Sequence, residues 1–189
     1  MDFQQGLITT VHDYSLGNLD PDVFNHELGQ RPTTLLIPCL MEEFHRPALA
    51  LIRDTLSGLK GLNKLVIALS ADCAEDVAYA ETFFTGMPFP VVMHWTNGPA
   101  VKELLESLTD LGLEVTGPPG KGWAVWQGLG VACQDSEVVG LFDADIRTFG
   151  SSYPERMLRP LLDSSHGVAY VKAFYSRLSL ETQALQGRA

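Results

Sequence analysis

The chain has 189 residues, 46% of them hydrophobic and 19% charged, and this length allows one sizeable hydrophobic core rather than two ordinary domains. Its net charge of -10 argues against a nucleic-acid backbone or an anionic membrane as the main partner, although local positive charge could still bind a small anion. The three cysteines are far apart and lack metal-ligand spacing, which suits a reducing cytoplasm. No signal-peptide pattern opens the chain, and no apolar run approaches the roughly 20 residues of a membrane helix. We therefore expect a cytoplasmic protein that binds neither nucleic acid nor membranes.

The first part of the chain is polar and is interrupted by glycines. We interpret residues 1–30 as a peripheral arm and residues 31–189 as the domain that carries the function. Within the arm, Asp20-Pro21-Asp22 predicts the start of a helix that continues into Phe24 and Leu28.

Strand-like and helix-like segments alternate after the arm. Apolar runs predict strands at residues 33–37, where Pro38 ends the run, and at 65–69, 90–95, 138–142 and 167–175. Helices are predicted to open at Pro47 and to occupy residues 74–84, 123–133 and 153–162, and the spacing of Val101, Leu104, Leu105 and Leu108 matches one face of another helix. This alternation indicates an α/β fold with a mainly parallel sheet and helices on both faces.

Two carboxylates, Asp143 and Asp145, follow the strand predicted at 138–142. Alternate side chains of an extended segment share a face, so both acids would point into one cleft if that geometry persists. Two such carboxylates repel each other unless a cation is near, and an Mg²⁺ or Mn²⁺ ion that also carries phosphate oxygens would supply the charge. Taken alone, the motif is more typical of a strand end followed by two solvated acids.

Polar side chains also follow the other predicted strands. The set that lies just past a strand end comprises Glu42, Ser70, Asp72, Asp143 and Asp145. Ligands of parallel sheets bind beyond the carboxyl ends of the strands, so this coincidence indicates a ligand site. Glu42 and Glu43 could accept hydrogen bonds from a base or a ribose, but acids favoured at a helix N-terminus explain them equally well.

Gly120-Lys121-Gly122 precedes a predicted helix and would place an ammonium group and backbone N–H groups at a helix N-terminus. Such a site suits a diphosphate, whereas a surface turn with a solvated lysine is the simpler explanation of the tripeptide alone. The stretch is not a Walker A loop, because Lys121 is followed by glycine rather than Ser or Thr.

Aromatic and histidine side chains add weaker signals. Trp123 and Trp126 are more typical of a core and groove wall than of a stacking platform, and His94 and His166, as lone histidines, are seldom metal ligands. Arg177, which follows the last predicted strand together with Tyr175, is a candidate phosphate ligand.

Four blocks in order give the chain a family resemblance. They are Pro38-x-Leu40-x-Glu42-Glu43, Gly120-Lys121-Gly122 with Val125-Trp126, Asp143-x-Asp145-Ile146, and Val171-Lys172-x-Phe174-Tyr175-x-Arg177. From about Thr33 to its end, the chain resembles the glucosyl-3-phosphoglycerate synthases, which are retaining glycosyltransferases with the GT-A fold. The ordered set is far more specific than any single block.

The resemblance implies transfer of glucose from a nucleotide-sugar donor, usually UDP-glucose, to the 2-hydroxyl of 3-phosphoglycerate, with Mg²⁺ or Mn²⁺ as cofactor. It implies a nucleotide-sugar-binding domain over residues 31–189, with Asp143 and Asp145 as the catalytic acids and Asp145 as the metal ligand. The donor contacts that it implies are Pro38, Leu40, Glu42, Ser70, Lys121 and Asp143. Gly187 and Arg188 resemble the start of the acceptor-phosphate motif. A homodimer is a candidate assembly.

The chain departs from the pattern in two respects. Many GT-A enzymes carry an acidic pair after the second strand, whereas this chain has Ser70-Ala71-Asp72, which leaves uridine and guanosine donors both open. Members of the family also continue well beyond the last residue of this chain, so it resembles an N-terminal portion.

Three other interpretations compete with this one. A haloacid-dehalogenase-type phosphatase also places Asp-x-Asp after a buried strand, but Arg147 stands where its motif needs Thr or Val. A sugar nucleotidyltransferase would need a glycine-rich loop where Pro38-Cys39-Leu40 is found. A nucleotide-sugar-binding fragment without activity agrees with the residues as well as an enzyme does.

Overall fold

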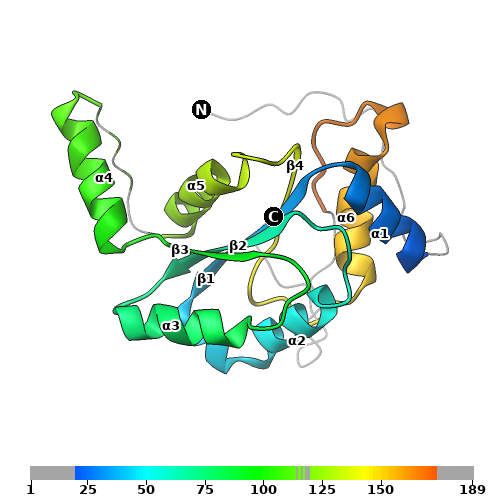
Figure 1. Ribbon diagram of the computed structural model, residues 1–189, viewed down its shortest axis with the longest axis horizontal. Coiled ribbons are helices and arrows are strands. Elements are labelled where there is room, and N and C mark those ends of the chain that lie inside the picture. The colour runs from blue at the N-terminus through cyan, green and yellow to red at the C-terminus, as the bar shows by residue number, and fades with distance from the viewer. Residues whose placement is uncertain (1–19, 114, 116, 118–119, 174–189) are drawn as a thin grey trace, which may run out of the picture.

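Four parallel strands form the sheet around which the described part of the chain is built (Figure 1). The computed structural model describes residues 20–113, 115, 117 and 120–173. The strands are β1 (Thr33–Leu40), β2 (Lys64–Ser70), β3 (Val91–Trp95) and β4 (Val138–Leu141), in the spatial order β3-β2-β1-β4. Every neighbouring pair is parallel, and Leu36 of β1 lies opposite both Val66 and Leu141. The parallel sheet predicted from the sequence is confirmed.

Helices cover both faces of the sheet, as predicted. On one face, the helices that contribute to the larger core are α1 (Pro21–Gln30), α2 (Pro47–Leu56), α3 (Ala74–Phe83) and α6 (Ser152–Leu162). Leu35 and Ile37 point into that core, whereas Leu36 between them points to the opposite face and joins a smaller cluster with Val66 and Ala132. α5 (Lys121–Ala132) covers this second face and lies across the sheet from α2 and α3 (Figure 1).

β1 continues through Pro38 to Leu40, so the expectation that Pro38 ends the strand is wrong. The carbonyl of Leu36 accepts a hydrogen bond from the backbone N–H of Phe142 at 3.0 Å, which places the polar backbone groups of even-numbered β1 residues on the side of β4. The pairing of β1 with β4 ends at Leu36. Because Pro38 faces β4 beyond that point, its missing N–H removes no hydrogen bond from the described ladder.

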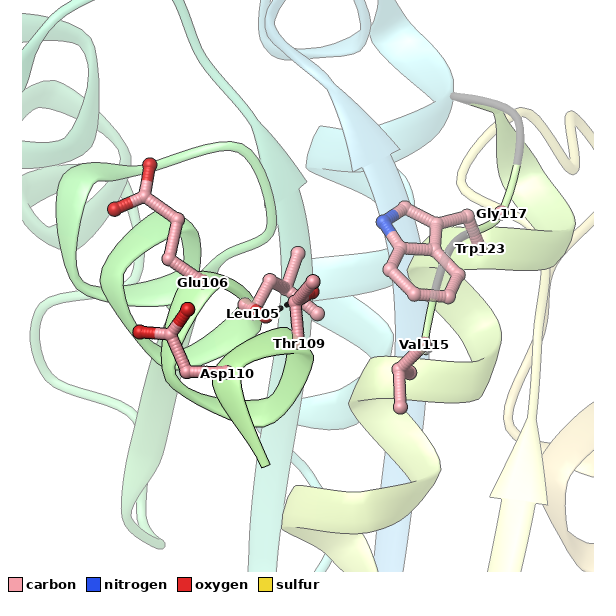
Figure 2. Close-up of a pocket in the computed structure, with 7 residues that line it drawn as sticks. All are labelled: Leu105, Glu106, Thr109, Asp110, Val115, Gly117 and Trp123. Atoms are coloured by element: carbon pink, nitrogen blue, oxygen red, sulfur yellow. Dashed lines mark hydrogen bonds between the residues drawn. The ribbon is translucent and has the colours of Figure 1, made fainter. Parts of the chain in front are cut away.

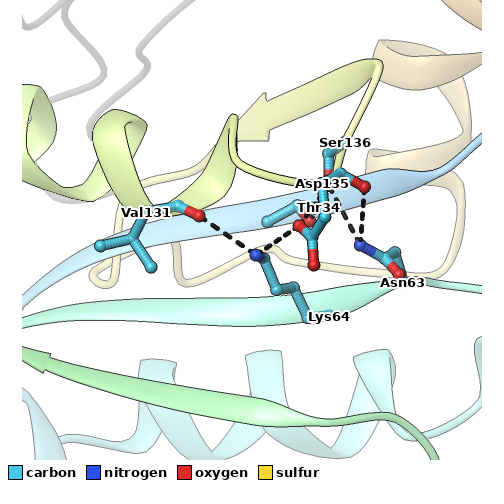
Figure 3. A network of polar contacts seen from close by, with 6 residues as sticks. All are labelled: Thr34, Asn63, Lys64, Val131, Asp135 and Ser136. Atoms are coloured by element: carbon cyan, nitrogen blue, oxygen red, sulfur yellow. Dashed lines mark hydrogen bonds and ion pairs between the residues drawn. The ribbon is translucent and has the colours of Figure 1, made fainter.

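A polar network at the amino end of the sheet fixes α5 to β2 (Figure 3). The buried ammonium group of Lys64 donates to the carboxylate of Asp135 and, at 3.1 Å, to the carbonyl of Val131 in the last turn of α5. Asn63 donates to the Asp135 carbonyl at 3.3 Å and to the Ser136 hydroxyl at 3.2 Å. The hydrogen bond from Lys64 lowers the pKa of Asp135. A cation near a helix C-terminus is also favourable, so this end of α5 is anchored electrostatically as well as geometrically.

One further expectation differs from the structure, whereas the helix predicted from the spacing of Val101 to Leu108 is confirmed. The strand expected at 167–175 is not formed by residues 168–173, while the remaining residues, 174 and 175, lie outside the described part. α4 (Pro99–Asp110) forms where the leucine spacing predicts a helix, but none of its residues is buried, so its apolar face is not packed against the core.

The first thirty residues are only partly described. Residues 1–19 lie outside the described part, and α1 occupies most of the rest of the predicted arm. Phe24 and Leu28 of α1 belong to the large core, so this helix is integrated with the domain rather than peripheral. The division into residues 1–30 and 31–189 stays a prediction. Among the described helices, none is long and apolar enough to cross a membrane.

Candidate functional site

The carboxyl ends of the strands bring several predicted site residues to one edge of the sheet. Leu40 and Ser70 are the last residues of β1 and β2, and they lie opposite each other in the strand register. Alternation along the strands places both on the face covered by α5. Leu40 is 55% exposed, whereas Pro38 is buried. Of the two predicted donor contacts in β1, Leu40 is therefore the accessible one.

Lys121 and Asp143, which are 22 residues apart, meet beyond this edge in an ion pair. Lys121 is the first residue of α5, and its side chain is 60% exposed while that of Asp143 is 38% exposed. A helix N-terminus repels cations, so a lysine there concentrates positive charge beside the free N–H groups of the first turn. Gly120 precedes it with φ 149°, a conformation that other residues rarely adopt. The free N–H groups of this helix N-terminus, with Lys121 beside them, make this corner a candidate anion site.

The loop that carries Asp143 and Asp145 is anchored by the apolar residues between them and before them. Phe142 and Ala144 are buried in the large core, and the Phe142 ring contacts that of Phe149 with 5.6 Å between centroids. The regular strand ends at Leu141 and Asp145 lies in a turn, so the extended geometry expected through both acids does not persist. Asp145 is exposed.

Asp143 and Asp145 supply hard carboxylate oxygens, the type of ligand that a divalent ion such as Mg²⁺ prefers. The described residues contain no group of three or more histidine, cysteine or acidic side chains that could hold a metal. Mg²⁺ does not need such a cage, because it usually takes one or two carboxylates from the protein and completes its shell with phosphate and water.

Glu42 and Glu43 lie in a short 3-10 helix, η1 (Met41–His45), directly after β1. Arg46 contacts both, with Nη1 at 2.5 Å from Glu43 Oε1 and Nη2 at 3.4 Å from Glu42 Oε2. Glu43 is buried and its second oxygen has no hydrogen-bond partner among the described residues. Burial raises the pKa of Cys39 to about 12, and the nearby Glu43 carboxylate adds to the shift. Glu42, by contrast, is 76% exposed, so its carboxylate is accessible to a ligand even though Arg46 contacts it.

The loop after β2 is held by two residues that the sequence analysis did not single out, Trp95 and Asn97. Both donate side-chain hydrogen bonds to the carbonyl of Ala71, each at 2.9 Å. Ser70 and Asp72 flank this alanine. The only sequence signal for the contact is the Thr96-Asn97-Gly98-Pro99 turn after the third predicted strand, which gives no hint of its partner.

His94 links two elements, whereas the tryptophans lie outside the core: Trp126 is 54% exposed and Trp123 is half-buried, so the expectation of a core position is wrong for Trp126. His94 Nε2 lies 2.8 Å from Gln127 Oε1, which links β3 to α5. The rings of Trp123 and Trp126 stack at 4.9 Å. A pocket of about 350 Å³ lies between α4 and the start of α5, and its lining residues are Leu105, Glu106, Thr109, Asp110, Val115, Gly117 and Trp123 (Figure 2). Neither Asp143 nor Asp145 lines it, so it is separate from the acidic loop.

The acceptor residues predicted from the sequence, Gly187 and Arg188, lie outside the described residues, as do Tyr175 and Arg177.

Two curated relatives align with essentially the whole chain. The chain is 30% identical over 192 residues to a glucosyl-3-phosphoglycerate synthase of Methanococcoides burtonii, covering 100% of this chain and 47% of the relative. It is 30% identical over 190 residues to the enzyme of the same name from Persephonella marina, covering 98% and 46%. The resemblance inferred from the four blocks is confirmed, and the chain spans about half the length of these relatives. No family model matches the chain.

Solved structures of glucosyl-3-phosphoglycerate synthase from Mycobacterium tuberculosis share the fold. One aligns with a TM-score of 0.56 at 22% identity, covering 85% of this chain and 51% of that one. Another, in complex with Mn²⁺, UDP and glucosyl-3-phosphoglycerate, aligns with a TM-score of 0.52 at 19% identity, covering 82% and 47%. A third contains Mn²⁺, UDP-glucose and glycerol 3-phosphate and gives a TM-score of 0.52 at 18% identity, covering 80% and 47%. The GT-A-like α/β fold is thereby confirmed.

Proposed function

We propose that this chain is part of a glucosyl-3-phosphoglycerate synthase, a retaining hexosyltransferase that moves glucose from UDP-glucose to 3-phosphoglycerate. The similarity of the whole chain to two curated enzymes of that name supports the proposal. The structural observation that carries it is the meeting of Lys121 and Asp143 at the N-terminus of α5, beyond the carboxyl edge of a parallel sheet.

Lys121 and the first turn of α5 would hold the diphosphate of the donor. Their positive charge opposes the negative charge that develops on the departing diphosphate, which is the largest contribution expected in such a transfer. Lys121 is paired with Asp143, so donor binding would move the ammonium group from the carboxylate to a phosphate. Asp143 would then be free to accept a hydrogen bond from the ribose or from a metal-bound water.

Asp145, with Asp143 beside it, would hold the Mg²⁺ or Mn²⁺ ion that the donor requires. When bound, that ion neutralises the diphosphate and stabilises the leaving group as a Lewis acid. Asp145 is exposed and forms no ion pair with the described residues, so its oxygens are accessible to an ion. The donor's own phosphate could act as the base, so a protein nucleophile is not needed.

The acceptor side is proposed from the resemblance. Gly187 and Arg188 would open the segment that binds the phosphate of 3-phosphoglycerate, with the arginine acting through its bidentate fork. The curated relatives are about twice as long as this chain, since the alignments cover 47% and 46% of them. We therefore expect these 189 residues alone to bind the donor without transferring glucose. We also propose a cytoplasmic location and self-association, with a homodimer as the simplest form.

A nucleotide-sugar-binding unit without activity is the second candidate, and the half-length alignment is the observation that favours it. Measuring glucosyl transfer from UDP-glucose to 3-phosphoglycerate, with this chain and with a version extended to the length of its relatives, separates the two. Transfer by the extended form supports the enzyme, whereas donor binding by both without transfer supports the binding unit.

Donor binding is tested by calorimetry with UDP-glucose, first in Mg²⁺ and then in excess chelator. We expect the affinity to fall in chelator, because the acidic pair repels an unaccompanied diphosphate. Lys121→Ala should weaken UDP far more than uridine, whereas Lys102→Ala, an exposed lysine on α4, should weaken neither. If UDP-glucose binds equally well with Mg²⁺ and in chelator, the metal has no role in donor binding. If Lys121→Ala reduces the affinity for UDP and for uridine by the same factor, Lys121 does not hold the diphosphate.

A further inference from the structure

We propose that Asn97 and Trp95 position the loop after β2 so that Ser70 and Asp72 select the base of the nucleotide donor. This inference rests on the proposed function, because it assigns the base specificity of the same donor site. Asn97 and Trp95 are positioning residues here, since they act through the loop and not on the ligand. We call their contacts to Ala71 the Asn97 clamp.

The clamp satisfies both backbone polar groups of Ala71. The Ala71 N–H donates to Asn97 Oδ1 at 3.1 Å, and Asn97 Nδ2 donates back to the Ala71 carbonyl at 2.9 Å. The indole N–H of Trp95 donates to the same carbonyl at 2.9 Å. An asparagine side chain thus pairs with a backbone amide much as a neighbouring strand would, at the point where β3 ends and regular pairing with β2 stops.

The residues around the clamp hold the neighbouring positions equally firmly. The backbone N–H and the hydroxyl of Thr96 both donate to the Leu69 carbonyl, at 2.8 and 3.0 Å. The Trp95 ring lies against Gly98, where an added Cβ would stand 2.6 Å from the indole. Asn97 therefore sits in a turn whose position is fixed on both sides.

Three backbone groups of the loop are therefore unavailable to a ligand. Ala71 is 3% exposed and its polar groups are occupied, while the N–H of Asp72 is bonded to Asp76 Oδ2 at 3.1 Å. Ser70 is half-buried and Asp72 is exposed, so their hydroxyl and carboxylate are polar groups that the loop offers to a ligand.

These side chains stand beside an exposed apolar side chain, that of Leu40. Leu40, directly opposite Ser70 in the register, is 55% exposed at the end of a strand that is otherwise buried. A nucleobase has apolar faces and a hydrogen-bonding edge, so an exposed leucine next to a fixed hydroxyl and a carboxylate matches both features. A site distinguishes two bases by hydrogen bonds only when its polar groups are held in place. If those groups can move, they pair equally well with either base and the selectivity is lost.

The test measures binding of Mg²⁺–UDP, Mg²⁺–GDP and Mg²⁺–pyrophosphate by calorimetry with the full chain and its variants. Asn97→Ala removes the two bonds that Asn97 makes with Ala71 and keeps the one from Trp95, whereas Asn97→Asp keeps the acceptor for the Ala71 N–H but sets an oxygen against the Ala71 carbonyl. Asn63→Ala is the matched control, because Asn63 also donates two side-chain hydrogen bonds but lies at the opposite end of the sheet.

We expect the Asn97 variants to weaken the preferred nucleotide by roughly fivefold to tenfold and to narrow the UDP-to-GDP ratio, with pyrophosphate affinity unchanged. Hydrogen exchange of the Ala71 amide should accelerate in Asn97→Ala and remain slow in Asn97→Asp. Asn63→Ala should leave all three affinities unchanged. If both Asn97 variants keep the wild-type ratio, or if they weaken pyrophosphate as much as UDP, the clamp does not set base specificity and donor binding still stands. If the wild-type chain binds none of the three probes, the proposed function fails and this inference fails with it.

Discussion

Gly128 sets how closely α5 can approach the sheet, and Gly128→Ala is the substitution that should push it away. An ideal Cβ at this position would lie 2.5 Å from Leu36 Cδ1 and 3.2 Å from Ala68 Cβ. Leu36 is fully buried, so its methyl group has little room to turn aside, and the Ala68 Cβ is fixed to the backbone of β2. The helix that starts at Lys121 must then shift outward.

The expected size of the effect follows from two opposing contributions. Overpacking a buried site of this kind costs about 1–3 kcal/mol. Replacing a glycine by alanine inside a helix gains about 1 kcal/mol. The net change in the free energy of unfolding should therefore lie between about 0 and 2 kcal/mol in the destabilising direction. Gly130→Ala is the control in the same helix, because an added Cβ there meets no atom within 4 Å and should bring only the gain.

Urea denaturation followed by circular dichroism compares the two variants directly. We expect Gly130→Ala to be more stable than Gly128→Ala by about 1–3 kcal/mol, with equal m-values. Because the shift moves Lys121, Mg²⁺–pyrophosphate should also bind more weakly to Gly128→Ala than to Gly130→Ala. Equal unfolding midpoints for the two variants would refute the close packing of α5 on Leu36 and Ala68.

Further predictions concern the acids and the cysteines. Asp145→Asn should reduce the metal-dependent part of UDP-glucose affinity more than Asp143→Asn does, which calorimetry with and without chelator measures; the opposite order would exchange the proposed roles. Burial raises the pKa of Glu155, so its folded form holds a proton more tightly and its contribution to stability falls as pH rises from the ordinary carboxyl value of 4.5. Glu155→Gln should therefore gain stability relative to wild type between pH 4.5 and 7 in urea titrations, and a constant difference would contradict the shift. Because its pKa is about 12, buried Cys39 should resist a thiol reagent at pH 8 until the chain unfolds, whereas exposed Cys73 and Cys133 should react at once.

Much of the sheet could be predicted because its strands are buried on both faces. Such strands appear in the sequence as continuous apolar runs, as at residues 65–69, and the structure places β2 there. The run at 167–175 has the same appearance, but Tyr170 is 79% exposed and residues 168–173 form no strand. An apolar run becomes a strand only where another strand is available to pair with it, and that depends on distant parts of the chain.

The candidate site was predictable in its parts but not in its contacts. The sequence identifies Lys121 and Asp143 as site candidates, yet nothing in their separation of 22 residues requires the ion pair that they form. Asn97 went unnoticed because an asparagine before Gly-Pro is typical of a turn, and its partner Ala71 lies 26 residues earlier. Local chemistry selects the residue types, whereas the topology of the sheet decides which of them meet.

The two ends of α5 carry their charges differently, and this difference would make the stability of the folded protein depend on the donor concentration. Lys64 donates to a carbonyl in the last turn of the helix, where the dipole favours a cation, whereas at the N-terminal end Lys121 lies against the dipole and is paired with Asp143. A diphosphate bound there, as proposed above, would add a favourable anion at that end, and a ligand at one hundred times its dissociation constant stabilises the folded state by about 2.7 kcal/mol. Such a shift lowers the unfolded population by roughly a hundredfold. Proteases that act on unfolded chains would then remove the protein quickly when donor is scarce and spare it when donor is plentiful.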